Sequence, residues 1–103
     1  MSSSSDSLST LQKQVDSLQQ EAARLQQQIQ TLSNQLMVKK EELQQLQNLP
    51  NAEGRIRKVQ DEIAQLERSI QALTNQVKAK QDELMKLRKL LNEASGNVQN
   101  LRP

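Results

Sequence analysis

One stretch of the sequence occurs twice, and its pattern restricts the chain to long helices. Residues 28–46 read QIQTLSNQLMVKKEELQQL, and residues 69–87, which lie 41 positions later, read SIQALTNQVKAKQDELMKL. In both copies the apolar residues alternate at spacings of three and four, which is the heptad pattern of a coiled coil. Two copies are too few to build a helical solenoid. The chain is therefore one helical unit written twice.

The heptad pattern assigns an apolar seam to each half of the chain. The strongest a and d positions are predicted to form the core or interface: Leu11, Leu18, Leu25, Ile29, Leu32, Leu36, Leu43, Leu46, Ile56, Ile63, Leu66, Ile70, Leu73, Leu84, Leu87 and Leu91. The remaining a and d positions hold Leu8, Val15, Ala22, Lys39, Val59, Val77, Lys80, Ala94, Val98 and Leu101. Each seam thus contains one lysine among apolar residues.

Breaker residues divide the chain into five parts. A disordered serine-rich N-terminus is expected over residues 1–6, a first helix over 7–48, a loop over 49–54, a second helix over 55–96 and a frayed tail over 97–103. The turn residues are expected to be Pro50, Asn51 and Gly54. Pro50 lacks an amide and disfavours helix at the residue before it. Asn48 can adopt the left-handed conformation that ends a helix, and Asn51 can cap the next one.

Two arrangements fit the seams: a kinked helix in a parallel dimer, or an antiparallel hairpin. Isoleucine at a with leucine at d, as in the second half, is the preference of parallel dimers. Folding the chain at Asn51, however, pairs Leu46 with Ile56 and carries one register along both seams to their ends. The heptad phase also slips by one residue between the halves, which a turn absorbs. We therefore predict an all-α antiparallel helical hairpin.

The two seam lysines bear on the orientation of the helices. In a parallel dimer each lysine would face its own copy, and the ammonium groups would repel. In the hairpin Lys39 faces Ile63 with Glu62 beside it, while Lys80 faces Ala22 with Glu21 beside it. Lys39, Lys80, Glu21 and Glu62 are therefore candidates for fixing orientation and register. The alternative is that the lysines are merely tolerated, with their charged ends in solvent.

The composition offers little to catalysis. Histidine and cysteine are absent, which removes the usual general base at neutral pH and the thiolate nucleophile. Neighbouring carboxylates such as Asp82 and Glu83 point around the helix rather than at one ion. The two glycines stand alone, so no phosphate-binding loop is present. We expect no catalytic, cofactor-binding or metal-binding residues and no small-molecule substrate.

Charge and hydropathy argue against nucleic acid and membranes as partners. The net charge is only +2, and aromatic residues, which could stack on bases, are absent. Basic residues are frequent in the second half, but acidic residues interrupt them. No apolar stretch approaches the ~20 residues of a membrane span, and the N-terminus does not resemble a signal peptide. A cytoplasmic location is the expectation.

The expected function is structural. A two-helix hairpin has a core only one seam wide, so hairpins are expected to self-associate into a dimer or helical bundle. The chain would then be a scaffold, tether or filament component whose partner is itself, or other coiled-coil proteins. The alternative is a helical adaptor or regulator that docks a partner helix in a larger complex.

Overall fold

Two long helices make up the part of the chain that the structure describes. In a computed structural model, the backbone is described for residues 3–100 and the side chains for residues 6–95. Helix α1 spans Ser3–Gln47 and helix α2 spans Glu53–Asn100, and residues 3–100 contain no strand. The predicted all-α fold of two long helices joined by one turn is confirmed.

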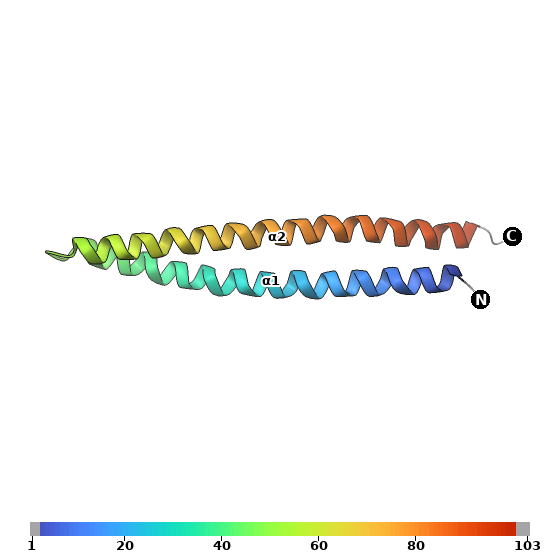
Figure 1. The fold of residues 1–103 in the computed structure, drawn as a ribbon, viewed down its shortest axis with the longest axis horizontal. Coiled ribbons are helices and arrows are strands. Elements are labelled where there is room, and N and C mark those ends of the chain that lie inside the picture. The colour runs from blue at the N-terminus through green and yellow to red at the C-terminus, as the bar shows by residue number, and fades with distance from the viewer. Residues whose placement is uncertain (1–2, 101–103) are drawn as a thin grey trace. The chain divides into compact units, whose positions relative to one another are not determined.

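The chain divides into two compact units, each of which takes in part of α1 and part of α2 (the helices are labelled in Figure 1). The turn unit, Leu25–Gln76, holds the end of α1, the turn and the start of α2. The terminal unit combines the residues up to Arg24 with those from Val77 onward. Within each unit one segment of α1 and one of α2 lie side by side and run in opposite directions.

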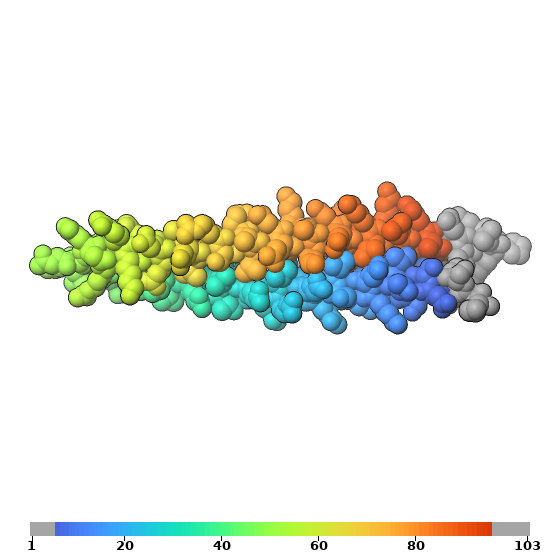
Figure 2. Space-filling model, in the orientation of Figure 1, coloured from blue at the N-terminus to red at the C-terminus, as the bar shows by residue number. Residues whose placement is uncertain are grey.

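Burial follows the predicted seams in both units. Every predicted a and d position from Leu8 to Ala94 is buried or half-buried. The side chains buried most completely are Val15, Ala22, Leu25, Leu46, Ala52, Val59, Val77 and Leu84. None of the described side chains is less than 2% exposed, however. The space-filling view shows the side chains of the α1 and α2 segments in contact with one another (Figure 2). The core is therefore one row of side chains thick.

The end of α1 tightens before the chain reverses. The amide of Asn48 donates to the carbonyl of Gln45 (3.3 Å), and the amide of Leu49 donates to the carbonyl of Leu46 (3.1 Å). Both bonds span three residues, which is the 3₁₀ pattern common at helix ends. Pro50 follows and has no amide with which to continue the helix.

The left-handed residue in the turn is Asn51, with φ of 57°, and not Asn48 as the sequence suggested. Asparagine tolerates this conformation better than most residues because its short side chain can bond locally. The first helical bond of α2 then runs from the amide of Ile56 to the carbonyl of Ala52 (2.8 Å). The expectation that Asn51 occupies the capping position is therefore wrong, since Ala52 holds that position.

Ala52 and Gly54 also differ from expectation. Ala52 is only 5% exposed and packs with Leu46 and Val59 in the core of the turn unit. Gly54 was assigned to the turn, but it lies in the first turn of α2, and a Cβ added there would meet no atom within 4 Å. Nothing at this position therefore requires a glycine.

Both helices are longer than predicted. Helix α1 begins at Ser3 rather than Ser7, and α2 begins at Glu53 and continues through Gly96 to Asn100. Once a helix is nucleated, each added residue gains a hydrogen bond, and serine or one glycine opposes this by only about 0.5–1 kcal/mol. The parts of the predicted disordered N-terminus and frayed tail at residues 1–2 and 101–103 lie outside the described residues.

Candidate interaction site

Two ion pairs join the helices, one in each unit. In the turn unit Lys39 Nζ lies 2.9 Å from Glu62 Oε2. In the terminal unit Lys80 Nζ lies 2.9 Å from Glu21 Oε2. Both lysines come from the apolar seam, and their stems are half-buried while their ammonium groups reach the glutamate beside the seam. The structure thus joins the four residues proposed to set orientation and register in two pairs, one in each unit.

The pairing perturbs the charged groups in the expected directions. The hydrogen bond with Glu62 raises the pKa of the Lys39 ammonium above its ordinary value, against the opposing effect of desolvation. The same bond lowers the pKa of the Glu62 carboxyl. The hydrogen bond with Glu21 raises the pKa of Lys80. The pairing therefore favours the charged forms of Lys39, Glu62 and Lys80 near neutral pH.

Lys39 has a second partner that the sequence reasoning missed. Its Nζ lies 3.4 Å from Glu42 Oε2, one turn further along α1. The spacing of three residues could have revealed this contact, since side chains three apart share a helix face. Glu42 and Glu62 together hold the ammonium of Lys39 from both helices.

Polar contacts on the surface of the turn unit repeat with the sequence. Gln30 Nε2 donates to Asn34 Oδ1 (3.1 Å) on α1, and Gln71 Nε2 donates to Asn75 Oδ1 (3.0 Å) on α2. These pairs occupy equivalent places in the two copies of the repeat. The segments that carry them, residues 25–38 and 69–76, contain no charged side chain. The ion pairs between the helices at Lys39 and Lys80 lie outside these uncharged segments.

An open groove lies beside each ion-paired seam. The groove of the turn unit has a volume of about 500 Å³ and is lined by Asn34, Gln35, Val38, Lys39, Glu62, Gln65, Leu66 and Ser69. The groove of the terminal unit has a volume of about 430 Å³ and is lined by Gln14, Ser17, Leu18, Glu83, Lys86 and Leu87. In the predicted heptads both sets combine c, d and g positions (Asn34 excepted), so each groove lies on the c and g side of the seam in its own unit.

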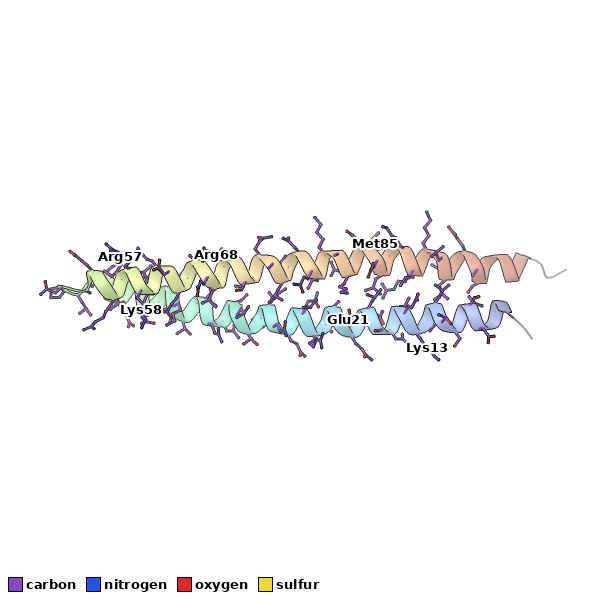
Figure 3. The ribbon with its side chains drawn as sticks, viewed as in Figure 1. Lys13, Glu21, Arg57, Lys58, Arg68 and Met85 are labelled. Carbon is purple, nitrogen blue, oxygen red and sulfur yellow. The ribbon has the colours of Figure 1, made fainter. Side chains whose placement is uncertain are left out.

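A few large apolar side chains lie outside the seam. They are Met37, Val38, Leu49, Met85 and Leu90, each more than half exposed. Met85, which is 70% exposed, lies on the side of α2 away from α1 (Figure 3). These side chains gain little burial from the fold of one chain, and single exposed apolar residues are common on protein surfaces.

The other predicted residues fall as follows. All sixteen residues of the predicted core or interface are buried or half-buried. Pro50 and Asn51 lie in the turn, and Gly54 lies in α2. Within the described part of the chain, no three or more acidic residues gather in a way that could hold a metal ion. Neither described helix contains an apolar stretch of the length needed to cross a bilayer.

Comparisons with known proteins give no relative: no family model, no curated protein and no solved structure matches this chain.

Proposed function

We propose that the chain is a non-enzymatic coiled-coil protein of structural assemblies, which self-associates through its heptad seams as a scaffold, tether or filament component. The observation that carries this proposal is the single-row core. Apolar a and d side chains line both helices, yet none is fully enclosed. Because burial of apolar area is the main stabilising term, a second copy that shields this seam further would stabilise the fold.

The charged residues support recognition between identical or similar helices. The two interhelical ion pairs join a seam lysine to a flanking glutamate in each unit, and they repeat with the sequence. Charged groups beside a coiled-coil seam select partners and orientation rather than adding much affinity. A helix with the same spacing of glutamate and lysine would satisfy the same contacts.

The second candidate is a helical adaptor or regulator that binds a partner helix. The groove of the turn unit favours this candidate, because two apolar residues, Leu66 and the 61% exposed Val38, line it. An amphipathic helix could place apolar residues there. Other coiled-coil proteins are then the expected partners.

Thermal unfolding followed by circular dichroism distinguishes the two functions. Self-association predicts a Tm that rises with protein concentration, because association stabilises the folded state by mass action. An adaptor predicts a low Tm that does not depend on concentration. A high, concentration-independent Tm of a monomer would contradict the proposed assembly.

A further inference from the structure

The apolar seam of each helix is already covered by the other helix of the same chain, which limits how a second copy can bind to it. In both units the a and d residues of α1 pack against α2 of the same chain. A second copy can pack against the outside of this seam, or it can make the same contacts as the hairpin by exchanging a helix. We propose, building on the proposed function, that the turn acts as a hinge and that two copies exchange helices, so that α1 of each pairs with α2 of the other.

Exchange preserves the core because nothing else holds the helices together. The described part of the chain has two helices and one connection, so every interhelical contact can re-form between two copies. The Lys39–Glu62 and Lys80–Glu21 ion pairs would also re-form. Such swapping is a low-cost route to dimers, because only the connecting segment changes its conformation.

The turn gives exchange a local driving force. Asn51 has φ of 57°, a left-handed conformation that is less favourable than helical or extended backbone for residues with a Cβ. Leu49 beside it is 52% exposed. Opening the turn relieves the left-handed conformation at Asn51. Opposing this, the closed hairpin has an effective concentration in the millimolar range, so exchange should increase as the protein concentration approaches that range.

The repeat also permits pairing of like helices, but with fewer core layers. An antiparallel pair of α1 helices would bring Lys39 of one copy to Glu21 of the other, since Glu21 and Glu62 are equivalent in the repeat. In that register Leu8 and Leu11 lose their apolar partners, which leaves ten layers between two helices where α1 and α2 form twelve. Pairing of α1 with α2 is therefore the favoured form of exchange.

Mixing two single-cysteine variants tests the proposal, because the natural chain has no cysteine. Gln35 and Ser69 are both exposed, come from different helices and line the same groove. Gln35→Cys and Ser69→Cys chains are mixed at increasing concentration and oxidised, and disulfide-linked dimers are separated without reductant. A closed hairpin holds only one cysteine and cannot make this bond within a chain.

The control mixture combines Gln35→Cys with Glu67→Cys in place of Ser69→Cys. Glu67 is exposed and lies on the other side of the seam in the predicted heptad. Exchange predicts a mixed 35–69 dimer that increases with concentration and exceeds the control dimer by at least about tenfold. Asn51→Val, which is strained further in the closed turn, should raise the mixed dimer about fivefold or more, whereas Asn51→Gly should lower it. Circular dichroism confirms that each variant is helical.

Three results would overturn the proposal. Equal yields in the test and control mixtures would indicate lateral contact between closed hairpins. Oligomers in solution without the 35–69 dimer would exclude exchange but leave self-association intact. A wild-type chain that stays monomeric at all concentrations, with no cross-linked dimer, would overturn both exchange and the proposed function.

Discussion

Lys39 Nζ lies 2.9 Å from Glu62 Oε2, so a lysine from the apolar seam of α1 binds a carboxylate at the edge of α2. The same contact joins Lys80 to Glu21. The ammonium group of each lysine adds no buried apolar area to the seam. It is best satisfied by an acidic side chain on the facing helix. A role of these contacts in selecting the pairing of helices can be separated by mutation from a role in stability.

Replacing Lys39 with leucine is expected to stabilise the helices and weaken their selectivity. Leucine buries its whole side chain in the seam, where the lysine keeps its charged end exposed, and such replacements often stabilise coiled coils. The urea midpoint of Lys39→Leu should rise, and sedimentation should show a broader range of oligomers. The control is Lys40→Leu at the neighbouring exposed position, which should leave the midpoint almost unchanged. A lower midpoint for Lys39→Leu would show that the ion pair stabilises the hairpin more than an apolar layer does.

The ion pair of Lys39 and Glu62 predicts a loss of stability in acid. The pKa of Glu62 is lower in the folded chain than its ordinary value of 4.5, so its contribution is present above that pH and is lost as the pH falls through the folded pKa. The pKa of Lys39 is raised, so its contribution is lost only as the pH rises above 10.5. The urea concentration at the unfolding midpoint of the wild type should therefore decrease as the pH is lowered below about 4.5.

Glu62→Gln is the variant that isolates this effect, because glutamine cannot titrate. The fall in acid should be smaller in Glu62→Gln than in the wild type. The matched control is Glu67→Gln, which removes another exposed carboxylate of α2. Its urea midpoint should depend on pH as that of the wild type does. Identical acid profiles for all three proteins would contradict a stabilising role for the Lys39–Glu62 contact.

Valine-to-alanine substitutions at two positions compare how much a side chain in the seam and one on the outer surface contribute to the free energy of unfolding. Val59 is 3% exposed and packs with Leu46 and Ala52, whereas Val38 is 61% exposed. Val59→Ala should lower the free energy of unfolding by about 1–2 kcal/mol, because it removes buried methyl groups and leaves a gap. Val38→Ala should change it by less than about 0.5 kcal/mol. A large effect at Val38 would mean that its side chain is covered by another copy in solution.

Gly54→Ala is expected to stabilise the protein. Gly54 is helical, and a Cβ at this position meets no atom within 4 Å, so alanine fits without strain. Alanine restricts the unfolded chain and favours the helix by about 0.5–1 kcal/mol. Chemical denaturation of the variant should show this gain. Destabilisation would indicate that Gly54 takes part in a contact between copies.

The heptads predicted the arrangement of the helices but not the details of their ends. Periodicity alone identifies which residues face the partner helix, and every tested seam position from Leu8 to Ala94 is buried or half-buried. Continuing the heptad back from Val59 would also have placed Ala52 in the seam. The choice between Asn48 and Asn51 for the left-handed position could not be made from the sequence, because asparagine suits both and the alternatives differ by little energy. Surface contacts such as Lys39 with Glu42 depend on rotamers that spacing permits but does not select.

Sedimentation equilibrium of the wild-type chain over a wide concentration range tests the central claim of self-association most directly. A single chain has a mass of 11.7 kDa. Self-association predicts that the average mass rises with concentration to at least twice this value. A mass that remains at one chain throughout, in a protein that circular dichroism shows to be helical, would contradict the claim and favour a hairpin that awaits a different partner.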